Sequence, residues 1–198
     1  MPQRRRMDPT ARRRDILEHA RDLFAERSYA DVTTADIARA AGVTRALVHH
    51  YCGGVHDIFL TVAAEFGATM ASVRNHGLEM PFEERVEANC VAYLDVVERN
   101  QHLWLAIMGQ VIPDSDAVEL LRAGIELNIE RMIQLHADVL SDTPETRVCL
   151  RAFIGFMTVT VREWLGGRAT REQTERLLIT MLIALVRQGV PAVQAVAR

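Results

Sequence analysis

Residues 33–51 read TTADIARAAGVTRALVHHY, and this stretch predicts two short helices joined by a tight turn. Thr33 and Asp36 form a Thr-x-x-Asp start, in which side chains satisfy free backbone N–H groups. Gly42 follows the first helix, where a residue that tolerates positive φ lets the chain turn. Thr44 is expected to cap the second helix. The pattern is typical of a helix-turn-helix, whose second helix enters the DNA major groove.

The second helix is expected to have two distinct faces, because residues three and four apart share a side of a helix. The inward face is predicted to consist of Leu47, Val48 and Tyr51. The outward face is predicted to carry Arg45, Ala46, His49 and His50. A cationic start followed by a polar stripe suits a recognition helix, so we predict a DNA-binding regulator.

The flanking segments fit a small helical DNA-binding domain. Residues 13–26 are predicted to form an amphipathic helix with Ile16, Leu17, Ala20, Leu23 and Phe24 on one side. Cys52 and the Gly53-Gly54 pair end the recognition helix, and a longer helix is expected from Val55.

Residues from about 12 to 64 resemble the DNA-binding domain of the TetR family of bacterial transcriptional repressors, through the run ILEHARDLFAERSYADVTTADIARAAGVTRALVHHY. The chain departs from the family pattern in three places. Cys52 stands where an aromatic residue is common, and His49 replaces the first tyrosine of a Tyr-His-Tyr end. Residues 53–55 replace a Pro-Ser-Lys-like turn, so the family's lysine–phosphate contact is in question here.

The predicted DNA contacts follow from this helix-turn-helix. Phosphate contacts are expected from Thr33, Thr34, Thr44, His50 and Tyr51. Base-edge contacts are expected from Arg45 to a guanine, Ala46 to a thymine methyl group, and His49. Arg12, Arg13 and Arg14 are expected to face phosphates at the start of the first helix. Arg4 to Arg6 are either a DNA-contacting arm or a solvated tail.

The charge of the 198-residue chain is unevenly distributed, with ten arginines against seven acids in residues 1–56 and 13 against 19 in the rest. A basic head on an acidic body suits a protein that places one end on DNA. Cys52, Cys90 and Cys149 match no metal spacing, and reduced thiols are expected, with redox sensing by Cys52 as an alternative. We expect no metal, no cofactor and, without an uninterrupted apolar run or signal core, a cytoplasmic protein with no membrane partner.

The fold is predicted to be all-α, with about nine helices and two domains. Residues 1–54 would form the N-terminal arm and helix-turn-helix domain, and residues 55–198 the effector-binding and dimerisation domain. In the body, one helix is expected to end near Ser141-Asp142, and the next to begin at Pro144 after Thr143. The last helix is expected to begin with a capping box at Thr170 and to close at Gly189 and Pro191.

The last two helices are apolar over more than one face, which implies burial against two layers. The resemblance implies that they pair with their copies in a homodimer, and the alternative is a larger monomer core. The predicted interface residues are Phe156, Val161, Trp164, Leu178, Met181, Leu182 and Leu185.

The resemblance also implies an effector pocket in the body. Its candidate residues are Phe66, Met70, Tyr93, Trp104, Met108, Asn128, Met132, Phe153, Phe156 and Met157, with His102 and His136 as further polar contacts. Methionine and aromatic walls favour a small, largely apolar ligand.

The predicted function is therefore a dimeric repressor that binds a near-palindromic double-stranded operator and is released by this ligand. Two alternatives are a helix-turn-helix protein without an effector, which acts as a partner-regulated or architectural DNA binder, and an enzyme. An enzyme is disfavoured because His49 and His50 point about 100° apart on a helix and because the chain has no i, i+4 histidine pair with a carboxylate base.

Overall fold

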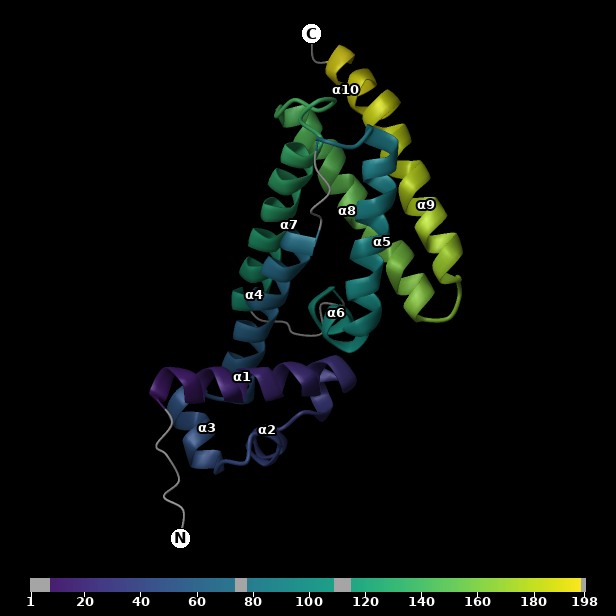
Figure 1. The fold of residues 1–198 in the computed structure, drawn as a ribbon. Coiled ribbons are helices and arrows are strands. Elements are labelled where there is room, and N and C mark those ends of the chain that lie inside the picture. The colour runs from purple at the N-terminus through teal and green to yellow at the C-terminus, as the bar shows by residue number, and fades with distance from the viewer. Residues whose placement is uncertain (1–7, 74–77, 109–114, 197–198) are drawn as a thin grey trace. The chain divides into compact units, whose positions relative to one another are not determined.

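The computed structural model describes residues 8–73, 78–108 and 115–196, and within these ranges the chain is helical without any strand. The helices are α1 (Pro9–Glu26), α2 (Thr34–Ala40), α3 (Arg45–Cys52), α4 (Val55–Val73), α5 (Phe82–Arg99), α6 (Gln101–Met108), α7 (Ser115–Leu135), α8 (Pro144–Leu165), α9 (Arg171–Ala184) and α10 (Val190–Val196) (Figure 1). A 3-10 turn, η1, covers Tyr29–Asp31, and a π-helical turn, η2, covers Leu185–Gly189. Since α9, η2 and α10 are continuous, the described residues form nine separate helices, and the all-α prediction is confirmed.

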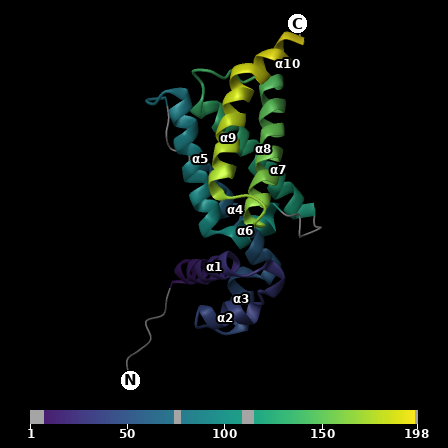
Figure 2. The same cartoon turned by 90° about the vertical axis from the view of Figure 1, so that its right-hand side faces the viewer.

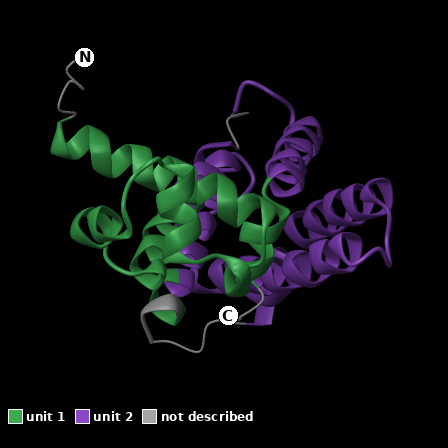
Figure 3. Cartoon of the chain, turned by 90° about the horizontal axis from the view of Figure 1, so that it is seen from below, with its two compact units in different colours: residues 1–66, 100–120 green, residues 67–99, 121–198 purple. Residues whose placement is uncertain are grey.

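The chain divides into two compact units, coloured separately in Figure 3. The first unit comprises the residues up to Phe66 together with Asn100–Leu120. The second comprises Gly67–Arg99 and Leu121–Arg198. The proposed domain boundary between residues 54 and 55 stays a prediction.

The first unit is built around the apolar side of α1. Phe24 of α1 meets Phe59 of α4 edge to face with ring centroids 5.3 Å apart, and Tyr29 meets the same ring at 4.7 Å. Fully or almost fully buried around them are Ile16, Ala20, Ile37, Val48, Ile58 and Val62. Because α1, α2, α3 and α4 all contribute to this core, it holds the helix-turn-helix in place.

Helix starts in both units are capped as the sequence predicts. Thr33 and Asp36 form a complete capping box on α2, and Thr44 caps α3. In the second unit, Thr143 caps α8 ahead of Pro144, and Thr170 forms a capping box on α9. Each of these caps satisfies N–H groups that a helix leaves without a partner.

The second unit is a layer of long helices in which α8 and α9 lie side by side, as both Figure 1 and Figure 2 show. Helix α9 also packs against α5. Fully buried residues in this unit include Leu94, Val97, Ile129, Leu150 and Val161.

The end of α7 differs from the prediction, because the helix stops at Leu135 and not near Ser141. The residues that follow form turns, with the N–H groups of Val139 and Leu140 donating to the His136 carbonyl. Arg85 of α5, which is fully buried, holds this segment by donating to His136 Nδ1 at 3.1 Å and to Asp138 Oδ1 at 2.5 Å. The periodicity of α7 gives no sign of this bond, since Arg85 is about 50 residues away.

The end of the last helix also differs from the prediction, because neither Gly189 nor Pro191 closes it. The Val190 N–H donates to the Leu185 carbonyl, which widens one turn to π geometry, and α10 continues to Val196. Pro191 is the second residue of α10 and has no N–H to donate, and α10 directly follows the π turn, where the regular hydrogen-bond pattern of the helix is already interrupted.

The continuous run Arg171–Val196 contains an 18-residue window of mean hydropathy 1.6, so by length and composition alone it could cross a membrane. Every 18-residue window of this run includes Arg187 and Gln188, so it is not an uninterrupted apolar run, and the expectation that the chain has none stays a prediction. Only 22% of the window is buried within the chain.

Candidate nucleic-acid interface and effector cavity

Helix α3 presents most of the predicted recognition residues to solvent. Arg45, Ala46, His49 and His50 are exposed, and Val48 is fully buried. Leu47 was predicted to face inward, and this is wrong, because its side chain is 38% exposed. Successive residues are about 100° apart on a helix, so with Val48 at the centre of the buried side, Leu47 lies towards the outward face.

Two of the three threonines predicted to contact phosphate, Thr33 and Thr44, cap the N-termini of α2 and α3. Thr33 Oγ1 accepts from the Asp36 N–H at 3.2 Å and donates to Asp36 Oδ2 at 2.5 Å. Thr44 Oγ1 accepts from the Leu47 N–H at 3.3 Å. Both threonines are exposed, and their contacts with phosphate stay predictions.

Asp36 is the most strongly perturbed carboxylate of this site. Hydrogen bonds from the Thr33 hydroxyl and the Thr33 backbone N–H, with further help from Arg39 and Arg27, lower its pKa to about 2. The carboxylate therefore stays ionised, and the capping box stays closed, throughout the pH range in which DNA binding is measured.

The turn after α3, where the family pattern has a lysine, consists of glycines here and is held by a hydrogen bond to Asp57. Gly53 takes φ 78° and ψ −153°, and the Gly54 N–H donates to Asp57 Oδ2 at 2.8 Å. Asp57 thus caps the start of α4, which the sequence analysis did not predict. A Gly-Gly-x-x-Asp pattern at the start of an apolar helix was the available signal.

The arginines at the start of α1 differ in their surroundings. Arg12 is half-buried and pairs with Asp15 at 3.2 Å, whereas Arg13 and Arg14 are exposed. Arg13 and Arg14 also line a groove of about 380 Å³, whose other walls are Thr10, Leu17, Glu18, Arg21 and Glu65. Arg4 to Arg6 lie outside the described residues.

Cys52 is a half-buried thiol at the end of the recognition helix. Its Sγ lies 4.0 Å from the Arg13 carbonyl oxygen, and burial raises its pKa. Since the thiolate is the reactive form, this environment disfavours the alternative in which Cys52 senses oxidants.

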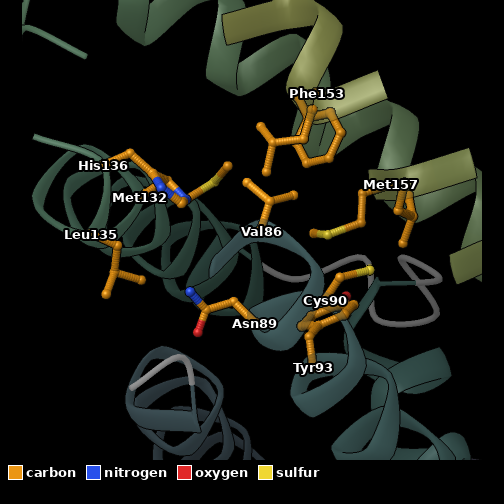
Figure 4. A pocket seen from close by; sticks show the side chains of 11 residues that line it. Val86, Asn89, Cys90, Tyr93, Met132, Leu135, His136, Phe153 and Met157 are labelled. Atoms are coloured by element: carbon orange, nitrogen blue, oxygen red, sulfur yellow. The ribbon is translucent and has the colours of Figure 1, made fainter. Parts of the chain in front are cut away.

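The second unit contains a cavity of about 40 Å³ enclosed by α5, α7, α8 and α9 (Figure 4). Of the predicted ligand contacts, Tyr93, Met132, Phe153, Met157 and His136 line it. The other lining residues, which were not predicted as ligand contacts, are Val86, Asn89, Cys90, Leu135, Leu178 and Leu182. Met70, Asn128 and Phe156 are in the same unit but outside the lining, while Phe66, His102, Trp104 and Met108 belong to the first unit.

The cavity is mostly apolar and small, with room for about one or two water molecules. In Figure 4, side chains of α5, α7 and α8 converge on it, with Met132 and Met157 on opposite sides. Methionine side chains are unbranched and adapt their shape easily, so a larger molecule could enter by displacing them. Its polar wall residues include Asn89 and His136, both buried.

The predicted dimer residues fall into three groups. Val161, Leu178 and Leu182 are buried within one chain, and Phe156, Trp164 and Leu185 are half-buried. Met181 is 41% exposed. Beside them α8 carries an exposed stripe of small and apolar residues, each about one turn from the next: Val148, Ala152, Gly155 and Val159. This stripe was not among the predicted interface residues.

Comparison with known proteins agrees with this geometry. Residues 16–60 match the family described as bacterial regulatory proteins, tetR family. The HTH-type transcriptional repressor AcnR of Corynebacterium glutamicum is 40% identical over 65 residues, which are 33% of this chain and 35% of AcnR, so the match spans about a third of AcnR.

Solved structures extend the similarity in fold to almost the whole chain. A tetR-family transcriptional regulator from Streptomyces coelicolor superposes with a TM-score of 0.79 at 24% identity, over 96% of this chain and 83% of that one. FadR of Thermus thermophilus, a TetR family repressor solved in complex with lauroyl-CoA, gives a TM-score of 0.65 at 20% identity, over 89% and 94% of the two chains.

Proposed function

Since the chain belongs to the TetR family of bacterial transcriptional regulators, we propose that it is a dimeric, sequence-specific repressor released from its operator by a small, largely apolar ligand. The observation that carries the proposal is α3, a capped helix that exposes Arg45, Ala46, His49 and His50 while Val48 anchors it in the core. AcnR and FadR are both described as repressors, which supports repression over activation.

In the proposed complex, α3 lies in the major groove. Arg45 is the residue that we assign to a guanine, because a guanidinium can donate two hydrogen bonds to guanine O6 and N7. Ala46 is assigned to a thymine methyl group and His49 to a base edge. Thr33, Thr34, Thr44, His50 and Tyr51 hold phosphates, together with Arg12 and Arg13.

The proposed homodimer forms through α8 and α9. Support comes from the exposed apolar side chains of these helices, which include Val148, Val159, Leu177 and Met181. A partner copy would cover the apolar window of α9 and α10, so that no membrane is needed and the protein is cytoplasmic. The two-fold axis would present two recognition helices to successive major grooves of an inverted repeat.

The proposed effector site is the cavity lined by Tyr93, Met132, Phe153 and Met157. The complex of FadR with lauroyl-CoA is a precedent for an apolar ligand in this fold. The ligand would enlarge the cavity, and it would release DNA only by favouring the state that does not bind the operator.

The main alternative is a helix-turn-helix protein regulated by a partner or acting architecturally, without an effector. The cavity volume of about 40 Å³ is the observation that favours it, because ligand pockets are usually several hundred Å³ in size. A ligand that raises the unfolding temperature of the protein and lowers its operator affinity would support the ligand-released repressor over this alternative.

The proposal is tested by selecting random duplex DNA on the purified protein at two salt concentrations. An enriched inverted repeat is the expected result, and salt-sensitive binding without a motif would contradict sequence-specific regulation.

Arg45→Ala should then lower operator affinity by about 1–3 kcal/mol and relax specificity at one position of each half-site. Arg99→Ala serves as the control, because Arg99 is an exposed arginine on α5, outside the helix-turn-helix. Unchanged affinity of Arg45→Ala for every operator variant would remove Arg45 from the base contacts.

A further inference from the structure

Leu47 is an exposed leucine on the face of α3 where polar residues were expected. Its side chain is 38% exposed, whereas its neighbour Val48 is fully buried. The Leu47 N–H is used by the Thr44 cap, so the backbone of this residue is fixed within the first turn of the helix. The leucine side chain therefore projects from a rigid position.

Leu47 lies at one edge of the exposed surface of α3. On a helix with 100° between residues, Ala46 and His50 lie opposite Val48, and Leu47 lies on one flank of that pair with His49 on the other. Ala46, Leu47, His49 and His50 are all exposed. Around the helix Leu47 is therefore next to His50 and Tyr51, and His49 is next to Ala46 and Arg45.

A leucine side chain has no hydrogen-bond donor or acceptor, so it cannot hold a phosphate or read a polar base edge. In the major groove the apolar group that a base pair offers is the C5 methyl of thymine. Burial of an exposed leucine against such a methyl group removes apolar surface of both partners from water.

We propose that Leu47 is a specificity-determining residue that recognises a thymine methyl group in each operator half-site. This inference rests on the proposed function, because it requires α3 to enter the major groove.

The test is a double-mutant cycle between the protein and the DNA. In the selected operator, each thymine is replaced in turn by deoxyuridine, which lacks only the methyl group, and affinity is measured for the parent protein and for Leu47→Ala. We expect one position at which the parent loses about fourfold in affinity per half-site, the value of one buried methyl group. At that position Leu47→Ala should bind the thymine operator and the deoxyuridine operator with equal affinity.

Two controls keep the result specific. Leu127→Ala removes a leucine on α7 that is 46% exposed, and it should keep the full sensitivity to deoxyuridine. Leu47→Met retains an apolar side chain and should keep most of that sensitivity. Because part of the Leu47 side chain is covered, the thermal unfolding midpoint of Leu47→Ala is measured as well, and affinities are compared at a temperature at which both proteins are folded.

The outcomes separate this inference from the proposed function. Absence of any enriched operator overturns both. An enriched operator whose deoxyuridine effects are the same in the parent and in Leu47→Ala overturns the role of Leu47 alone, and leaves sequence-specific binding intact.

Discussion

At the scale of single residues, Asp36 links the stability of the helix-turn-helix to pH. Its carboxylate closes the capping box of α2, and its pKa falls from an ordinary 3.8 to about 2 through the two bonds from Thr33. A carboxylate whose pKa is lower in the folded state stabilises that state at pH values above its unfolded pKa. The contribution disappears as pH falls from about 4 to about 2.

We therefore predict that Asp36→Asn lowers the free energy of unfolding at pH 7 and that its difference from the parent shrinks between pH 4 and pH 2. The measurement is denaturant unfolding of both proteins at several pH values, followed by circular dichroism. Thr33→Ala removes the other half of the box and should cost about 1 kcal/mol at pH 7. A constant difference between parent and Asp36→Asn down to pH 2 would contradict the assigned role.

At the scale of elements, the junction between α3 and α4 depends on a glycine. Gly53 adopts φ 78° and ψ −153°, a region that is open to glycine almost alone. A Cβ at this position would lie 2.4 Å from Asp57 Oδ2, the atom that caps α4 through Gly54. We predict that Gly53→Ala costs about 1–3 kcal/mol in unfolding free energy.

The matched control for Gly53→Ala is Gly42→Ala in the turn of the helix-turn-helix. Gly42 also has a positive φ, 62°, but a Cβ there would meet nothing within 4 Å. Gly42→Ala should therefore lower the free energy of unfolding only by the backbone strain, about 1 kcal/mol. If Gly53→Ala and Gly42→Ala unfold at the same denaturant concentration, the clash with Asp57 does not contribute to the free energy of unfolding.

The end of α7 depends on Arg85, whose guanidinium bonds His136, Asp138 and the Met80 carbonyl oxygen from a fully buried position. We predict that Arg85→Ala costs about 3 kcal/mol, because a buried cation and its bonds are lost together. Thermal or denaturant unfolding measures this loss.

Arg187→Ala is the control for Arg85→Ala. Arg187 also pairs with an acid of α5, Glu83, at 2.8 Å, and this pair lowers the pKa of Glu83. Both of its side chains are about half exposed, so the pair should contribute less than about 1 kcal/mol. Equal losses for the two arginine variants would mean that burial of Arg85 adds nothing.

At the scale of the whole molecule, the exposed stripe on α8 predicts where two copies meet. Gly155 lies in that stripe, and a Cβ at this position would meet nothing within 4 Å. Gly155→Arg should therefore leave the folded chain intact, and arginine is a better helix former than glycine. Because a charged side chain would be forced into the proposed interface, we predict a shift from dimer to monomer in light scattering after gel filtration.

Gly124→Arg is the control for Gly155→Arg, since Gly124 is a glycine of α7 with equally open surroundings. It should remain dimeric. A dimer in both variants would place the interface elsewhere. If Gly155→Arg becomes monomeric, its operator affinity should also fall, since one half-site alone offers half of the contacts.

The sequence by itself determined the helical class, the helix-turn-helix and most helix starts. Thr33, Thr44, Thr143 and Thr170 cap their helices as predicted, because a cap forms between residues no more than a few positions apart. Gly42 turns the chain for the same reason, since its φ is a local property.

Only the tertiary structure decided which side chains are covered. Leu47 was expected inside and is exposed, while Arg85 is buried, and Leu178 and Leu182 line the cavity of their own unit. Burial depends on partners far away in the chain, such as His136 for Arg85, and periodicity along one helix carries no information about them. The end of α7 was missed for the same reason, because Arg85 bonds the residues that follow this helix from far away in the chain. The end of α10 was missed for a local reason, because the π turn from Leu185 to Gly189 lets the helix continue past Gly189 and Pro191.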